Sequence, residues 1–194
     1  MSPSGRTHPV AESRREPVVA NGVLGMLIFV FTEGMVFAGL ISAFTIIRAQ
    51  AIVWPPAGQP RLPIEETALN TAALMLSGLA LYWAHRCFRR DPRSALRPLF
   101  VTLLLGSFFV VFQGAEWVRL ISEGLTMTSS SLGSFFYLIV GLHGLHAVAA
   151  IALLAYVYVL LRRGWLSAGR LASAEVLWYF VVGVWPVLYG VVYR

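Results

Sequence analysis

Five long apolar runs with few or no charges constrain this chain more than any other feature. They span about residues 22–47, 65–87, 97–121, 133–161 and 174–193. A helix rises about 1.5 Å per residue, so about 20 residues cross the roughly 30 Å of a bilayer's hydrocarbon core. Only helices and closed barrels span lipid, and these runs do not alternate as barrel strands do. We therefore predict an all-α, polytopic transmembrane bundle of five helices.

Composition supports a single membrane domain over residues 21–194. Hydrophobic residues make up 58% of the chain and charged residues 12%, whereas soluble domains have about 25% charged residues. Residues 1–20 are polar and proline-containing, and we predict that they form a flexible cytoplasmic tail. The single cysteine, Cys87, excludes an intrachain disulfide and a cysteine-based metal cluster.

The basic residues, all arginine, are distributed unevenly. Eleven lie in the tail and in the connectors after the second and fourth runs, which five spans place on one side of the membrane. The other four lie on the opposite side and are Arg48, Arg61, Arg119 and Arg194. The positive-inside rule then predicts a cytoplasmic N-terminus and an outer C-terminus. Because these arginines sit in short connectors, we interpret them as topology signals and lipid contacts, with no nucleic acid as partner. Candidates for headgroup contact are Trp83, Arg86, Arg89 and Arg90.

The connector WPPAGQPRLP, residues 54–63, has four prolines in ten residues. Proline fixes φ and lacks an amide donor, so we predict a stiff, extended loop. Such a loop either packs on a neighbouring subunit or simply ends the helix before it.

Ionisable groups at membrane depth are costly, and they usually pair, face protein or touch a water path. Glu33 lies near the middle of the first run, and His143 lies about ten residues into the fourth, at a similar depth. We therefore expect a contact between Glu33 and an imidazole, either as an ion pair or with a neutral carboxylic acid.

Other polar side chains lie nearer the helix ends. Gln113 and Glu116 are three residues apart on one helix face. We expect Glu116 to be an interface residue, paired with an arginine or a neighbouring chain. His85 lies near the inner end of the second run.

The stretch GLHGLHAV, residues 141–148, places His143 and His146 on one helix face. Three interpretations stay open: a metal or haem site, hydrogen bonds between helices, and a proton relay that includes Glu33. A closed metal site needs three or four ligands, which the spans do not offer, so a metal is disfavoured. Gly141 and Gly144 flank His143, and we expect close helix packing on that face.

Five stretches in order carry a family resemblance. They are TEGMVFAG from Thr32, WPPAGQPRLP, LNTAALMLSGLALYWAH (residues 69–85), FQGAEW and GLHGLHAV. Together the chain resembles subunit III of haem–copper oxygen reductases of the cytochrome c oxidase type.

The resemblance implies a non-catalytic subunit of an aerobic oxidase in a bacterial plasma membrane, with a periplasmic C-terminus. It implies subunit I as the main contact, subunit II nearby, phospholipid in a cleft between helices, and support of proton uptake and sustained turnover. Haem and copper are expected in the partner subunits, with no cofactor in this chain. Glu33 matches the family's carbodiimide-reactive carboxylate, and His143 and His146 match a structural histidine pair.

Two departures keep alternatives open. Many members have seven helices, and this chain lacks the first two. Tyr179 and Val182 stand where the family's last helix has His and Asp. An accessory subunit of a quinol oxidase or of a nitric oxide reductase is therefore an alternative. Two alternatives from other functional classes also stay open, a proton channel or transporter that uses Glu33 and a membrane haem protein. The spans show no inverted repeat, which disfavours a transporter.

Overall fold

The computed structural model describes residues 21–53 and 64–193, and all regular structure within these ranges is helical. The elements are α1 (Asn21–Gln50), α2 (Ile64–Phe88), the short 3₁₀ helix η1 (Pro92–Ala95), α3 (Leu96–Ser122), α4 (Ser131–Arg163) and α5 (Ala168–Val192). Each α-helix in the described ranges is long and apolar enough to cross a membrane, which confirms the predicted five-span bundle. The predicted flexible tail, residues 1–20, and the proline-rich connector, residues 54–63, lie outside the described residues.

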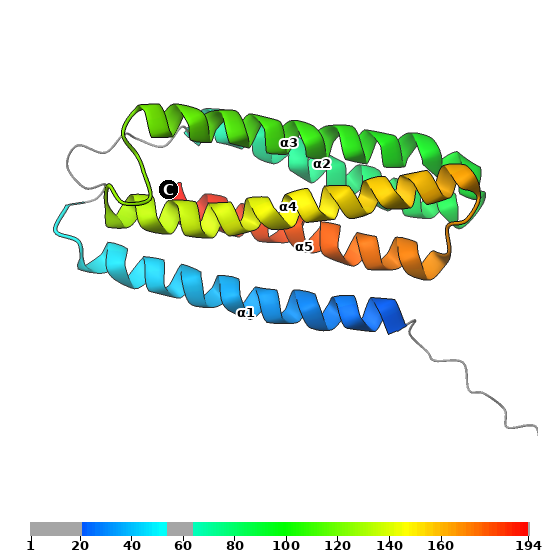
Figure 1. Cartoon of the computed structure of the whole chain (residues 1–194), viewed down its shortest axis with the longest axis horizontal. Helices are drawn as coiled ribbons and strands as arrows, with labels where there is room; N and C mark the ends of the chain where they lie inside the picture. The colour runs from blue at the N-terminus through cyan, green and yellow to red at the C-terminus, as the bar shows by residue number, and fades with distance from the viewer. Residues whose placement is uncertain (1–20, 54–63, 194) are drawn as a thin grey trace, which may run out of the picture.

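Four of the helices form a ring, and the first packs on its outside. Within the ring α2 contacts α3, α3 contacts α4, α4 contacts α5, and α5 returns to α2. α1 lies along α4 and α5, apart from α2 and α3 (Figure 1). α1 buries Phe37 and Phe44 against these neighbours, while most of its apolar surface faces outward. A helix that is apolar all round is typical of a membrane span.

Two tryptophans of α5 fill the centre of the ring. Trp178 Nε1 donates a hydrogen bond to Ser77 Oγ at 3.2 Å, and Trp185 Nε1 donates one to Thr71 Oγ1 at 2.8 Å. Both indoles are fully buried, so each polar edge is satisfied by α2. A Cβ added at Gly106 of α3 would lie 2.5 Å from the Trp178 ring, so this glycine permits the close approach of α3 to α5.

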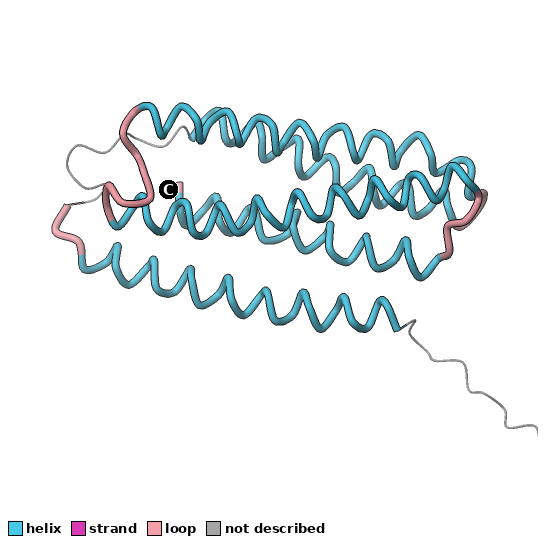
Figure 2. Tube along the Cα trace, in the orientation of Figure 1, coloured by secondary structure: helices cyan, strands magenta, loops and turns pink. Residues whose placement is uncertain are grey.

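Nine of the ten predicted helix boundaries lie within three residues of the observed ones, and the exception is the start of α5. α5 begins at Ala168 rather than near 174, because the Ser167 hydroxyl caps it by accepting a hydrogen bond from the Arg170 amide at 3.4 Å. Arg170, predicted to be a connector residue, thus lies in the first turn of α5. The connector from α4 is correspondingly short (Figure 2). It opens at Gly164, whose φ of 75° ends α4 in the left-handed conformation.

Candidate functional site

Three separate groups of polar side chains within the spans each contain a glutamate. The first, called here the Glu116 cluster, contains Thr67, Asn70, Gln113, Glu116 and Tyr193. The second is the Glu33–His146 pair between α1 and α4. The third is the His85–Glu175 pair between α2 and α5.

The Glu116 cluster ties α2 and α3 to the end of α5. Thr67 Oγ1 donates to the two Glu116 carboxylate oxygens at 3.2 and 3.3 Å. Gln113 Nε2 donates to Glu116 Oε2 at 2.9 Å and to the Tyr193 hydroxyl at 3.1 Å. Asn70 Nδ2 donates to the Phe109 carbonyl at 3.2 Å. Glu116 is 5% exposed, so this carboxylate is held by donors of its own chain.

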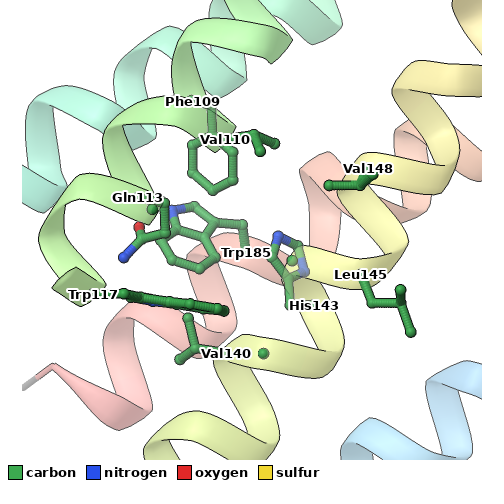
Figure 3. Close-up of a pocket in the computed structure, with 12 residues that line it drawn as sticks. Phe109, Val110, Gln113, Trp117, Val140, His143, Leu145, Val148 and Trp185 are labelled. Atoms are coloured by element: carbon green, nitrogen blue, oxygen red, sulfur yellow. The ribbon is translucent and has the colours of Figure 1, made fainter. Parts of the chain in front are cut away.

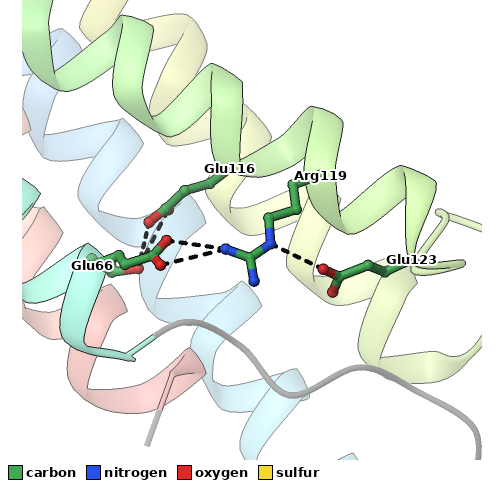
Figure 4. A network of polar contacts seen from close by, with 5 residues as sticks. Glu66, Glu116, Arg119 and Glu123 are labelled. Carbon is green, nitrogen blue, oxygen red and sulfur yellow. Dashed lines mark hydrogen bonds and ion pairs between the residues drawn. The ribbon is translucent and has the colours of Figure 1, made fainter.

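Within the described residues Glu116 has Thr67 and Gln113 as its partners rather than an arginine, and a contact with a neighbouring chain stays a prediction. Arg119, the nearby cation, instead contacts Glu66 at 3.4 Å and Glu123 at 3.0 Å (Figure 4). All three of these side chains are solvent-exposed near the helix ends. Arg119 lies almost one turn closer to the end of α3 than Glu116, which allows its guanidinium to stay outside the packed ring.

The Glu33–His146 pair joins the outer helix to the ring. Glu33 Oε2 lies 3.2 Å from His146 Nε2, and His146 Nδ1 lies 2.7 Å from the Leu142 carbonyl oxygen. A carbonyl oxygen only accepts, so Nδ1 carries a proton. A contact between Nε2 and a carboxylate oxygen then requires one more proton, on the imidazole or on the carboxyl group. The contact between α1 and α4 is therefore an ion pair or a hydrogen bond from a protonated carboxyl group.

The predicted contact between Glu33 and an imidazole is confirmed, but the imidazole is that of His146 and not that of His143, whose depth was compared with Glu33. His143 is 1% exposed, and no hydrogen-bond partner for either ring nitrogen lies within the described residues. Its ring lies among Trp185, Phe109 and Phe37, at centroid distances of 5.0, 6.2 and 6.3 Å. Counting residues from helix ends assumes that the helices start at the same depth. The packing of α1 on α4 instead brings Glu33 to His146, one turn further along α4 than His143.

The His85–Glu175 pair includes a residue that the sequence analysis missed. His85 Nδ1 lies 2.9 Å from both Glu175 oxygens, and Glu175 is 7% exposed. A predicted helix start near 174 placed Glu175 at a helix end, where a carboxylate is unremarkable. With the true start at Ala168, Glu175 lies two turns inside the helix and needs a partner.

The lipid-headgroup candidates lie together on the surface near the end of α2. Trp83 is 67% exposed, and Arg86, Arg89 and Arg90 are exposed as well. Arg86 Nη1 donates to the Tyr82 hydroxyl at 3.0 Å, and its guanidinium lies 5.8 Å from the centroid of that ring. In residues 21–53 and 64–193, no three His, Cys, Asp or Glu side chains converge to hold a metal ion.

Comparison with known proteins identifies the family. Residues 10–194 match the family model described as cytochrome c oxidase subunit III. The chain is 34% identical to a protein of Nocardia farcinica named as a probable cytochrome c oxidase subunit 3, over 88% of this chain and 86% of the relative. It is 30% identical to the cytochrome c oxidase subunit 3 of Syncerus caffer and to that of Phoca vitulina, over 94% of this chain and 73% of each. The five sequence motifs and these matches agree, and the chain belongs to the cytochrome c oxidase subunit III family.

Proposed function

We propose that this chain is the non-catalytic subunit III of an aerobic haem–copper oxidase in a bacterial plasma membrane. Subunit I is its main contact, subunit II lies nearby, and those partners hold the haem and copper. The observation that carries the proposal is the family match over residues 10–194.

The arrangement of the polar groups supports a stabilising role rather than a catalytic one. The Glu116 cluster and the two buried tryptophans direct their hydrogen bonds between helices of this chain. Hydrogen bonds between membrane helices hold a bundle in one arrangement. A rigid ring of this kind is suited to packing against a partner subunit.

A role in proton uptake is supported by the Glu33–His146 pair. A carboxyl group and an imidazole lie 3.2 Å apart there, and the Glu33 side chain is 22% exposed where α1 meets the ring. Carboxylate and imidazole groups in membrane spans commonly serve proton pathways. In this proposal the pair delivers or buffers protons at the surface of the complex.

Phospholipid binding is proposed at the exposed group Trp83, Arg86, Arg89 and Arg90. A tryptophan beside arginines at a helix end matches the interface between headgroups and hydrocarbon. A shallow pocket formed by Tyr82, Trp83, Arg86, Cys87 and Arg90 offers space for a phosphate group there.

The proposed orientation places the N-terminus in the cytoplasm and the C-terminus in the periplasm. The His85–Glu175 pair then lies near the cytoplasmic surface and the Glu116 cluster near the periplasmic one. An alkaline phosphatase fused after residue 194 should be active, and a fusion in the connector at residues 164–167 should be inactive. The reverse pattern would contradict this orientation.

The function is tested by purifying the complex from its host through an affinity tag on this chain. We expect a haem-bearing subunit I in the preparation, and a haem optical spectrum. A stable oligomer of this chain that contains no haem would contradict the proposal. Removal of this chain should also shorten the active lifetime of the enzyme during turnover, while initial electron transfer persists.

A further inference from the structure

Two of the pockets on the bundle differ in their chemistry. One is a groove between α3 and α4 with an almost wholly apolar lining, and no feature of it selects an occupant (Figure 3). The other, called here the arginine pocket, has a volume of about 510 Å³ and lies where the α2–α3 and α4–α5 connectors meet. Its charged lining residues are Asp91, Arg93, Arg162 and Arg163. Charge of one sign in a recess of this size indicates a site for an anion.

The arginine pocket lies at the ends of the spans. α4 ends at Arg163, and η1 follows directly after the end of α2. Both connectors lie at the same end of the bundle, and α4 contacts η1 there (Figure 1). The ends of helices that span a bilayer lie at the level of the headgroups, so the pocket meets lipid phosphates rather than acyl tails alone.

The three arginines of the pocket have no counterion within the chain as described. The ion pairs found in residues 21–53 and 64–193 involve other basic side chains. Asp91 is the one carboxylate of the lining, and it caps η1 by accepting a hydrogen bond from the Arg93 backbone amide at 3.2 Å. Like charges around one recess repel, and an anion bound between them removes that repulsion.

Two of the arginines are held near the pocket by local structure. The guanidinium carbon of Arg163 lies 5.8 Å from the centroid of the Trp165 ring, within the range of a cation–π contact. Arg93 lies inside η1, whose start is fixed by the Asp91 cap. A guanidinium group presents a planar fork of donors that matches two oxygens of a phosphate.

The rest of the lining is apolar and distinguishes a lipid from a free anion. Phe88, Leu96, Leu161 and Leu166 line the same pocket, and all four belong to or pack against the hydrophobic core. Inorganic phosphate gains nothing from such walls. The glycerol backbone and first acyl carbons of a phospholipid lose apolar contact with water when they are buried there.

We propose that the arginine pocket binds one anionic phospholipid, whose phosphate lies between Arg93, Arg162 and Arg163 and whose glycerol backbone packs on Leu96 and Leu161. This site is separate from the exposed group of Trp83, Arg86, Arg89 and Arg90. It depends on the chain lying in a membrane and not on its role in an oxidase. The bound lipid joins the two connectors and so ties the end of α4 to η1.

The test uses the intact complex in nanodiscs of phosphatidylcholine, with a phosphatidylglycerol that carries a diazirine near the start of one acyl chain. Peptic digestion, which does not depend on arginine, and mass spectrometry locate the crosslinks. We expect saturable labelling of residues 92–96 and 161–166, competed by unlabelled phosphatidylglycerol but neither by phosphatidylcholine nor by inorganic phosphate. Arg93→Gln and Arg162→Gln should each weaken apparent binding about tenfold, the size expected for one lost charge-assisted hydrogen bond.

Arg97→Gln is the matched control. Arg97 is also an exposed arginine, one turn after Arg93, but it does not line the pocket. Its charge is solvated and screened by salt, so this variant should change the labelling by less than about twofold. Subunit composition should be unchanged in all variants.

Several results would overturn the proposal. Labelling that is absent from the wild type, equal in Arg93→Gln and Arg97→Gln, or competed equally by phosphatidylcholine would exclude a selective site. Displacement by inorganic phosphate would identify a free anion as the ligand. Capture of a neighbouring subunit by a photoreactive amino acid in place of Leu166 would show a protein contact instead. None of these results bears on co-purification with subunit I, so the proposed function is tested separately.

Discussion

The Glu116 cluster and the Glu33–His146 pair both hold a glutamate within the spans, but they do so differently. Glu116 lies inside the ring, 5% exposed, and accepts hydrogen bonds from Thr67 and Gln113. Glu33 lies on the peripheral helix with its side chain 22% exposed, and its Oε2 lies 3.2 Å from His146 Nε2. The comparison teaches that helix position decides whether a carboxylate is enclosed by packed side chains or lies partly exposed between two helices.

The largest expected contrast is in chemical reactivity. A membrane-permeant carbodiimide modifies protonated carboxyl groups, and it needs access to them. We expect Glu33 to be modified while Glu116 stays unmodified, because packed side chains cover the latter. Mass spectrometry of peptides from the treated complex measures both sites, and modification of the two at equal rates would break the comparison.

The next largest effect is expected on stability. Glu116→Leu removes the buried acceptor of hydrogen bonds from the Thr67 hydroxyl and the Gln113 amide, and should destabilise the bundle by about 2–3 kcal/mol. Thermal loss of this chain from the purified complex is the measurement. Glu123→Leu, on an exposed helix end, is the control and should change little. If both variants behaved alike, the cluster would not be a structural element.

A smaller effect on stability is expected at the Glu33–His146 contact between α1 and α4. Glu33→Leu removes the contact to His146 and should cost about 1 kcal/mol, the usual size of one hydrogen bond between membrane helices. Glu33→Gln should be nearly neutral for stability, because its amide can donate to the unprotonated His146 Nε2. The same thermal assay separates the two variants, while proton uptake by the complex should fall in both. Equal destabilisation by Leu and Gln would argue against the assigned proton positions.

The smallest effect is expected for Arg119→Gln. The guanidinium contacts Glu66 and Glu123 at the exposed helix ends, where water solvates the charges and salt screens them. We expect no measurable change in the thermal assay at physiological ionic strength. A clear loss would show that this arginine contributes to a subunit contact.

Local sequence properties predicted the fold better than they predicted the site. Hydropathy located all five spans, because the length and composition of a helix alone decide whether it can cross lipid. The start of α5 was misplaced, since the apolar run begins later than the Ser167 cap that starts the helix. Glu175 was missed for that reason.

Contacts between helices required the tertiary structure. The i, i+3 spacing correctly placed Gln113 and Glu116 together, since one helix contains both residues. Residue counting predicted a contact between Glu33 and an imidazole, but the choice of His146 over His143 depended on how α1 sits along α4. Close packing was also expected beside Gly141 and Gly144, and a Cβ added at these glycines would lie 3.7 and 3.4 Å from the Trp117 ring, with a groove opening beside them.

The sequence by itself therefore determined the five apolar spans, the family and the set of polar side chains that needed partners. These follow from hydrophobic burial and local motifs, which do not depend on distant residues. Only the tertiary structure decided which polar groups meet, which carboxylate is sealed and where buried donors remain unpaired. The reason is that lipid-embedded helices can slide and rotate past one another without changing their own hydrogen bonds, so their register is set by the packing of all five together.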